Sequence, residues 1–173
     1  MKRLLLLFSA TLLMVNFTSC NKDPETDPDI VSQIASQTAS SYTIKWVRLE
    51  NIPMTDANND TWDTGIFGGS DPDIFFKLYD NSNNVIYTSD VENNVSSSDL
   101  PITWNGVNTT IDFKTAECSI RFYDKDDGLD DSDVMAWCEI NNSHLTPGNS
   151  SFVWYNNEIG VRFTIGLSWS YTH

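Results

Sequence analysis

The sequence predicts an all-β protein, a single eight-stranded antiparallel β-sandwich. From Tyr42 onward it consists of short runs of β-branched and aromatic residues divided by Asn, Asp, Ser and Gly, which is typical of strands joined by turns. No stretch after Cys20 places apolar residues at a convincing helical period. Seven or eight short strands in about 130 residues indicate one two-sheet sandwich.

The expected strands follow one another without an internal repeat or a second domain. Ile30–Ser40 fits either a short helix or an early edge strand, and both interpretations stay open. The composition of Asn81–Asn84 predicts a hairpin turn between two of the runs. The predicted strands are Tyr42–Glu50, Ile74–Asp80, Val85–Asp90, Thr109–Lys114, Cys118–Tyr123, Val134–Ile140, Ser151–Tyr155 and Gly160–Tyr171.

The first 19 residues have the layout of a secretory signal peptide. Lys2 and Arg3 precede a mostly apolar run from Leu4 to Val15, and small residues follow just before Cys20. The run is shorter than the roughly 20 apolar residues of a membrane-spanning helix. A retained membrane anchor is the alternative.

Phe17-Thr18-Ser19-Cys20 resembles a bacterial lipobox, in which the cysteine becomes the lipid-bearing first residue. Phe17 stands where that motif has an aliphatic residue, so cleavage without lipidation is an alternative. Residues 20–40 are then the lipidated cysteine and a tether, acidic and without apolar residues over Asn21–Asp29. This tether resembles those of surface-exposed Bacteroidota lipoproteins. It implies a cell-envelope protein, anchored to the outer membrane through Cys20, with the displayed leaflet left open.

The charge of the chain is strongly negative. Its 10 Lys and Arg against 24 Asp and Glu give −14, and removal of Lys2 and Arg3 with the signal gives −16. Such a field repels nucleic acid and draws in cations, so no nucleic-acid partner is expected. Because 40% of the residues are hydrophobic, residues 41–173 can still fold around a core.

Two segments between predicted strands concentrate the acidic residues, Pro53–Asp73 and Asp124–Asp133. Ca²⁺ takes six to eight oxygen ligands, mostly carboxylates and carbonyls, and loops at one end of a scaffold can supply them. A solvated acidic surface is the alternative. An EF-hand is excluded, because Gly128 comes one residue too early and Met135 stands where that loop requires glutamate.

The order of motifs between Tyr42 and Ile140 resembles a C2 domain, the calcium- and lipid-binding β-sandwich. The stretch Tyr42–Pro53 is similar to the opening strand of that family, and Ser70–Leu78 to its SDP turn and apolar strand. Pro101–Asn105 is similar to its Trp-Asn turn. Ile120–Ala136 is similar to its strand, aspartate loop and strand.

The resemblance implies the calcium ligands. From the first loop it implies Asp56 together with Asp73 or Asp71, and the choice between these two stays open. From the later loop it implies Asp124, Asp126 and Asp133, with Asp131 as a substitute. Both loops are longer than is usual in the family.

Cys118 and Cys138 flank the later acidic loop, six residues before Asp124 and five after Asp133. If the flanking strands are neighbours, a disulfide would clamp the base of the loop, and this bridge is predicted. Two buried free thiols are the alternative.

The tryptophans are mostly expected in the core, because they alternate with polar neighbours along strands. Trp62 is the exception, since it lies within an acidic loop. We expect Trp62 to pack that loop onto the sandwich, with contact to a membrane or a sugar as alternatives. The tryptophans predicted to be in the core are Trp46, Trp104, Trp137, Trp154 and Trp169.

No catalytic constellation is recognisable, because His144 and His173 are isolated and no nucleophile or phosphate motif occurs. A non-enzymatic, calcium-dependent binding module is therefore expected. Its membrane link is Cys20, and its further partner is a phospholipid headgroup, a glycan or a protein. The alternative is a calcium-independent surface lipoprotein that binds a glycan or protein through its acidic loops and Trp62.

Overall fold

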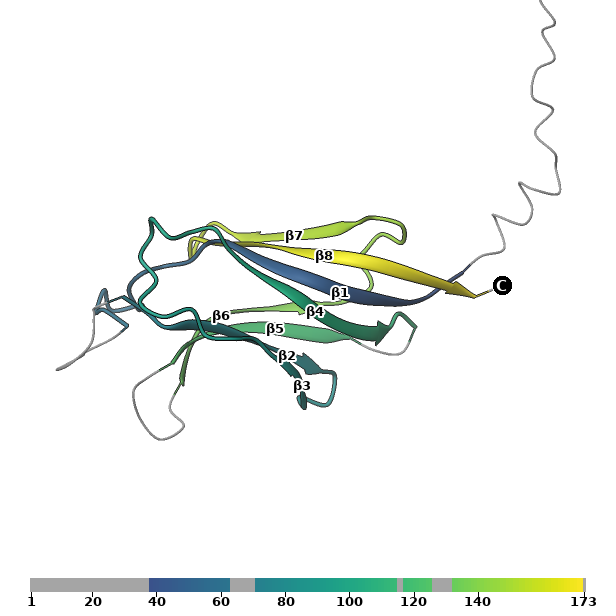
Figure 1. Cartoon of the computed structure of the whole chain (residues 1–173), viewed down its shortest axis with the longest axis horizontal. Helices are drawn as coiled ribbons and strands as arrows, with labels where there is room; N and C mark the ends of the chain where they lie inside the picture. The colour runs from purple at the N-terminus through teal and green to yellow at the C-terminus, as the bar shows by residue number, and fades with distance from the viewer. Residues whose placement is uncertain (1–37, 63–70, 115–116, 126–131, 173) are drawn as a thin grey trace, which may run out of the picture. The chain divides into compact units, whose positions relative to one another are not determined.

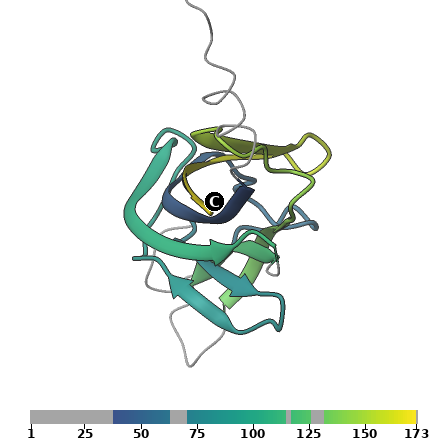
Figure 2. The ribbon, with the colours of Figure 1, turned by 90° about the vertical axis from the view of Figure 1, so that its right-hand side faces the viewer.

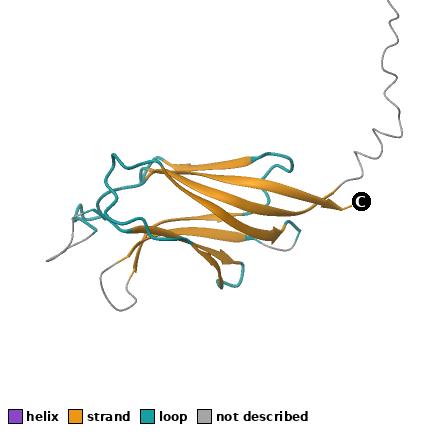
Figure 3. Cartoon of the chain, viewed as in Figure 1, coloured by secondary structure: helices purple, strands orange, loops and turns teal. Residues whose placement is uncertain are grey.

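The computed structural model describes residues 38–62, 71–114, 117–125 and 132–172 (Figure 1). Their regular structure is entirely β-strand (Figure 3), and within these ranges no helix has the length and apolar character of a bilayer span. The strands are β1 (Thr38–Asn51), β2 (Ile74–Asp80), β3 (Val85–Thr88), β4 (Ile102–Asp112), β5 (Cys118–Lys125), β6 (Ser132–Ile140), β7 (Ser151–Asn156) and β8 (Val161–Thr172).

The strands form two four-stranded antiparallel sheets that face each other (Figures 1 and 2). The order in one sheet is β4-β1-β8-β7, and in the other it is β3-β2-β5-β6. The all-β, eight-stranded sandwich predicted from the sequence is thereby confirmed. β6 and β7 are edge strands of different sheets, as are β3 and β4.

The first strand is longer than the sequence predicted. β1 pairs with β8 from Thr38, opposite Thr172, to Asn51, opposite Arg162. Thr38–Ser40 therefore belong to the sandwich and not to the predicted tether, and they favour a strand over a helix for the described part of Ile30–Ser40. This strand is an inner one, between β4 and β8, and not the expected edge strand. Cys20 and the predicted signal lie outside the described residues.

The Trp-Asn segment is a strand and not a turn. β4 begins at Ile102, seven residues before the predicted Thr109, and buries Trp104 and Val107. Gly106 and Asn108 have positive φ angles of 74° and 50°, where Gly and Asn are favoured. The register between β1 and β4 also shifts there, so a bulge carries β4 through residues that read as a turn.

The predicted hairpin between β2 and β3 is present and is organised by Asp80. Its carboxylate accepts backbone hydrogen bonds from Ser82 (2.9 Å) and Asn84 (2.8 Å), and another from the Asn84 side chain (2.9 Å). These bonds, with the Asn84 side-chain bond foremost, lower the pKa of Asp80. Asn83 takes the positive φ of 64° that the turn needs.

Aromatic side chains from both sheets meet in the core. Phe122 of β5 is fully buried and lies 5.3 Å, centroid to centroid, from Phe163 of β8. It also contacts Phe76 of β2 at 6.0 Å and Trp104 of β4 at 6.3 Å. Phe122 therefore joins the two sheets through its contacts with Phe163 and Trp104, and each such pair adds to the stabilisation from area burial.

Trp46 explains the one glycine within β8. A Cβ atom on Gly166 would lie 2.1 Å from Cε2 and Nε1 of Trp46, much closer than atoms can approach. The indole of half-buried Trp46 therefore lies flat against the Gly166 backbone, which is its register partner. Trp46 thus covers the outside of the β1–β8 pair rather than filling the core between the sheets.

Candidate functional site

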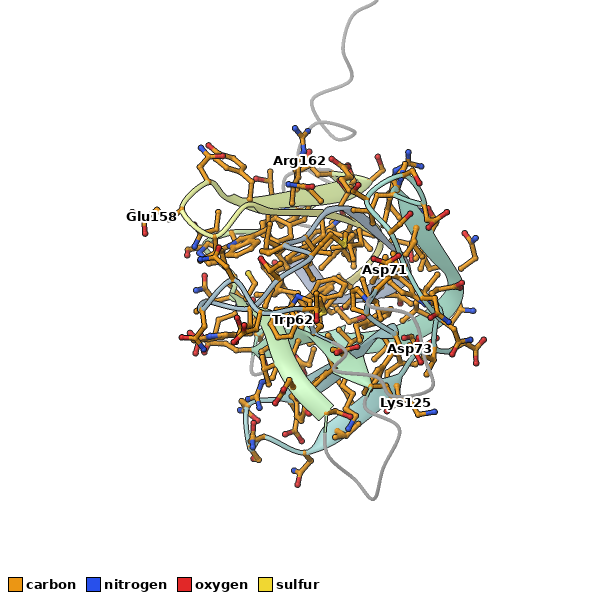
Figure 4. The ribbon with its side chains drawn as sticks, turned by 90° about the vertical axis from the view of Figure 1, so that its left-hand side faces the viewer. Trp62, Asp71, Asp73, Lys125, Glu158 and Arg162 are labelled. Atoms are coloured by element: carbon orange, nitrogen blue, oxygen red, sulfur yellow. The ribbon has the colours of Figure 1, made fainter. Side chains whose placement is uncertain are left out.

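The candidate site lies where β2 begins, β5 ends and β6 begins. Ile74 is the register partner of Asp124, and Asp124 is the partner of Asp133. Asp73 directly precedes Ile74, so three of the predicted ligands lie at neighbouring strand ends, at one end of the sheet. Figure 4 views this end of the sandwich and labels Asp71, Asp73 and Lys125.

Asp124 is the most buried acidic residue of the described chain, with no exposed surface. Its Oδ1 accepts a hydrogen bond from the backbone N–H of Asp73 at 2.8 Å. The backbone N–H of Lys125 in turn donates to the carbonyl of Asp73 at 2.9 Å. A buried carboxylate needs such compensation, because removal of a charge from water is costly.

Asp73 is the first-loop aspartate that the structure ties to Asp124. Besides the two bonds above, its Oδ1 accepts a hydrogen bond from the backbone N–H of Asn94 at 2.6 Å. Asn94 lies between β3 and β4, so Asp73 connects three segments of the site. Asp71 is half-buried two residues earlier, and Asp133 is exposed beside Asp124.

Asp56 organises its own turn. Its Oδ1 accepts hydrogen bonds from the backbone N–H groups of Asn58 (2.8 Å) and Asp60 (2.9 Å), and Oδ2 accepts one from the Asn58 side chain (3.0 Å). These bonds, with that from Asp60 foremost, lower the pKa of Asp56. The carboxylate thus has a local structural role, which the resemblance did not predict.

Trp62 packs the first loop against the sandwich, as expected. Its Nε1 donates a hydrogen bond to the Pro53 carbonyl at 2.9 Å, and its partly buried ring contacts the core. The bonded polar edge and the contact with the core support loop packing over contact with a membrane or a sugar.

The predicted ligands Asp126 and Asp131 lie outside the described residues. Within the described ranges, no group of three or more His, Cys, Asp or Glu side chains is arranged to hold a metal ion. The structure therefore brings Asp73, Asp124 and Asp133 to one sheet end but does not by itself complete a coordination shell.

Cys118 and Cys138 are buried free thiols, so the predicted disulfide is not formed in the structure. Cys118 is the register partner of Ile140, and Cys138 that of Ile120, which makes the cysteines diagonal neighbours. Such positions lie about 7–8 Å apart, beyond the usual Cα separation of a bridge. Burial raises the pKa of Cys118 to about 11 and that of Cys138 to about 12, so both stay protonated near neutral pH.

Trp137 is, after Trp46, the second tryptophan whose predicted core position is wrong. Its side chain is 55% exposed on β6, whereas Trp104 is buried and Trp154 and Trp169 are partly buried against the core. His144 lies near it, with Nδ1 3.1 Å from the Glu139 carbonyl and its ring stacked on Phe152.

Comparisons with known proteins agree with the architecture. The sequence matches no protein-family model and no curated protein. In structure it is similar to a C2 domain of plant Extended Synaptotagmin 1, with 13% identity, a TM-score of 0.50, and coverage of 78% of this chain and 97% of that domain. Another C2 domain gives 15% identity, a TM-score of 0.48, and coverage of 75% and 98%.

Human GIVD cytosolic phospholipase A2, in complex with methyl gamma-linolenyl fluorophosphonate and terbium chloride, is also similar in part. The identity is 13%, the TM-score is 0.47, and the match covers 78% of this chain and 18% of the phospholipase. The chain therefore spans less than a fifth of that protein. At these identities the likeness concerns the fold alone, which is a β-sandwich of the C2 type.

Proposed function

We propose that this protein is a lipid-anchored, calcium-binding module of the cell envelope. Ca²⁺ binds at the end of the sandwich where β2, β5 and β6 meet. Asp73, Asp124 and Asp133 supply carboxylates from the sheet, and Asp126 and Asp131 supply them from the segment between β5 and β6. Asp71 flanks the site, while Asp56 keeps its place in its own turn.

The observation that carries the proposal is the buried carboxylate of Asp124 between two other acidic residues. Neighbouring strands lie about 5 Å apart, and two carboxylates at about 5–6 Å repel by about 3 kcal/mol at an effective dielectric of 20. The register places Asp133 directly opposite Asp124, and Asp73 next to Ile74, the partner of Asp124, in spite of this cost. A divalent cation bound between the carboxylates attracts each of them and makes the total electrostatic energy of the site favourable.

The donor chemistry favours calcium over a softer metal. The candidate ligands are all carboxylate oxygens, which suit hard cations. Cys118 and Cys138 are buried within the core with raised pKa values, and the Nδ1 of His144 is directed to a backbone carbonyl. Among the described residues, neither the thiols nor this imidazole nitrogen is at the site, as a zinc centre would require.

The ion has a structural role in this proposal, which is to hold the segment between β5 and β6 against the first loop. A site of this kind works with a dissociation constant of about 10⁻⁴ to 10⁻³ M in an extracellular setting. Recruitment of anionic phospholipid is disfavoured, because the chain after residue 19 carries only eight basic residues. The lipid on Cys20 supplies the membrane link instead.

Isothermal titration of the purified protein with CaCl₂ tests the site. We expect saturable binding, and we expect Asp124→Asn to weaken it by about ten-fold or more, since asparagine keeps the shape but not the charge. Glu158→Gln is the matched control, because Glu158 is exposed and its side chain makes no hydrogen bond or ion pair within the described residues. Equal affinity in all three proteins would refute the proposal.

The anchor is a separate part of the proposal and rests on the sequence. The basic start, the apolar run and the small residues before Cys20 support export followed by lipidation. Cys20→Ser is expected to move the protein from the membrane fraction to the soluble envelope fraction. An unchanged membrane fraction would remove lipidation at Cys20 from the account and leave the calcium site untouched.

A further inference from the structure

A groove of about 440 Å³ lies between the edge strands β6 and β7, and its lining follows β6 from Val134 to Glu139. This size falls within the range of small-molecule sites. The groove runs along the open side of the sandwich, where one sheet ends in β6 and the other in β7. Its lining includes Trp137, Glu139, Asn141, His144, Trp154 and Asn156.

Two indole rings give the groove its apolar surface. Trp137 projects from β6 with 55% of its surface exposed. It also lines a second hollow of about 390 Å³ with Arg121, Val134 and Glu139, so a ligand can approach the ring from two sides. Trp154 faces the groove from β7 and is fixed from behind by stacking on Phe163 at 5.2 Å. An exposed tryptophan beside a hollow indicates a contact surface.

The polar groups of the groove are held in place by the chain around them. Oδ1 of Asn141 accepts a hydrogen bond from the Ser143 backbone at 3.0 Å, and Oδ1 of Asn156 accepts one from Glu158 at 2.9 Å. Each Nδ2 is left as a donor without a protein partner among the described residues. Fixed donors and acceptors bind at a lower entropic cost than mobile ones.

His144 and Glu139 supply the remaining polar groups of the groove. The imidazole is fixed by its Nδ1 contact with the Glu139 carbonyl at 3.1 Å and by stacking on Phe152 at 6.1 Å, which leaves Nε2 for a ligand. The exposed Glu139 carboxylate is a hydrogen-bond acceptor on the same wall. The groove therefore combines flat apolar rings with both donors and acceptors.

We propose that this groove binds a neutral glycan. A sugar ring has an apolar C–H face, which packs on an indole, and a rim of hydroxyl groups that both donate and accept hydrogen bonds. The amide groups of Asn141 and Asn156 match hydroxyl acceptors, and Glu139 matches a hydroxyl donor. No calcium ion takes part in this contact, so the site goes beyond the proposed calcium centre.

The charge of the molecule argues against an anionic ligand. Glu139 is the formally charged residue of the groove lining, and the chain after residue 19 carries −16, so phosphate or sulfate groups would be repelled. A peptide strand could pair with the free edge of β6 or β7. The side-chain amides and rings of the groove are not needed for such backbone pairing, and they favour the saccharide.

Calorimetric titration with neutral oligosaccharides tests the proposal. The probes are maltohexaose, cellohexaose, xylohexaose, mannohexaose and hexa-N-acetylchitohexaose, each up to about 10 mM, a range that detects dissociation constants near 1 mM. We expect at least one to bind the wild-type protein. Trp137→Ala is expected to weaken that binding by about ten-fold or more, because a central tryptophan carries much of the binding energy of a contact.

Two variants make the result specific. Tyr171→Ala removes another exposed aromatic ring, 42% exposed on β8, that does not line the groove, and it should leave the affinity unchanged. Asp124→Asn, which alters the proposed calcium site, should also leave it unchanged, so failures of the two proposals are distinguishable. If none of the five sugars binds, or if Trp137→Ala binds like the wild type, the glycan site is refuted.

Discussion

Replacing Phe122 with alanine is expected to lower the free energy of unfolding by about 3–5 kcal/mol, the usual cost of a large cavity in a core. Phe122 has no exposed surface and contacts aromatic rings from both sheets, Phe163 at 5.3 Å and Phe76 at 6.0 Å among them. Its removal leaves a void between the sheets and ends three ring contacts. Urea denaturation measures the change as a lower midpoint.

Phe122→Leu and Tyr155→Ala are the matched controls. Leucine fills most of the space, so the loss should stay near 1.5 kcal/mol or below. Tyr155 is 64% exposed on β7, and its truncation should cost less than about 1 kcal/mol. A loss below about 1 kcal/mol for Phe122→Ala would mean that the two sheets do not depend on this contact.

Adding calcium is expected to raise the free energy of unfolding by about 2.7 kcal/mol at 100 times the dissociation constant. For a domain of this size, this corresponds to a rise in melting temperature of roughly 10 °C relative to protein in chelator. The physical reason is that the ion binds the folded arrangement of Asp73, Asp124 and Asp133, whereas the unfolded chain separates these residues. Differential scanning calorimetry with CaCl₂ and with EDTA measures the shift.

The variants show where that stabilisation arises. Asp124→Asn should abolish most of the calcium-dependent shift, while the Asn oxygen can still accept the hydrogen bond from Asp73. Glu158→Gln should keep the full shift, because it removes one negative charge from a residue separated from Asp71 and Asp73 (Figure 4). A shift that survives Asp124→Asn would place the ion elsewhere on this acidic surface.

Strand identity was predictable from the sequence, but the position of bulges was not. The strand predicted at Ile74–Asp80 has the same bounds in the structure, because this run is apolar, rich in aromatic residues and ended by a turn sequence. β4 was predicted seven residues too short at its start, since Asn105 and Gly106 read as a turn. Only the structure shows that positive φ angles at Gly106 and Asn108 absorb the irregularity within a continuing strand.

The sequence also did not show which side chains of β6 point into the core. Val134–Ile140 is apolar at nearly every position, so alternation does not say which side chains point inward. The register with β5 shifts between Phe122 and Tyr123, and as a result Met135 and Ala136 are both buried while Trp137 is exposed. This local irregularity turns an expected core tryptophan into the wall of a groove.

The residues of the acidic site could be predicted, but which of them lie side by side could not. The sequence alone could not choose between Asp71 and Asp73, because the long first loop leaves the register of the following strand undefined. The structure shows that Ile74, the residue directly after Asp73, is the register partner of Asp124. The predicted disulfide failed for the same reason, since adjacency of two strands does not specify that the cysteines are diagonal and not directly opposed.

The most direct test of the account is the position of the ion itself. Crystals grown with CaCl₂, and a second set soaked with TbCl₃, give anomalous difference maps in which a bound cation appears as a peak. We predict a peak among the carboxylates of Asp73, Asp124 and Asp133, and its absence from crystals of Asp124→Asn. A map with no peak at this end of the sheet would contradict the calcium-binding function.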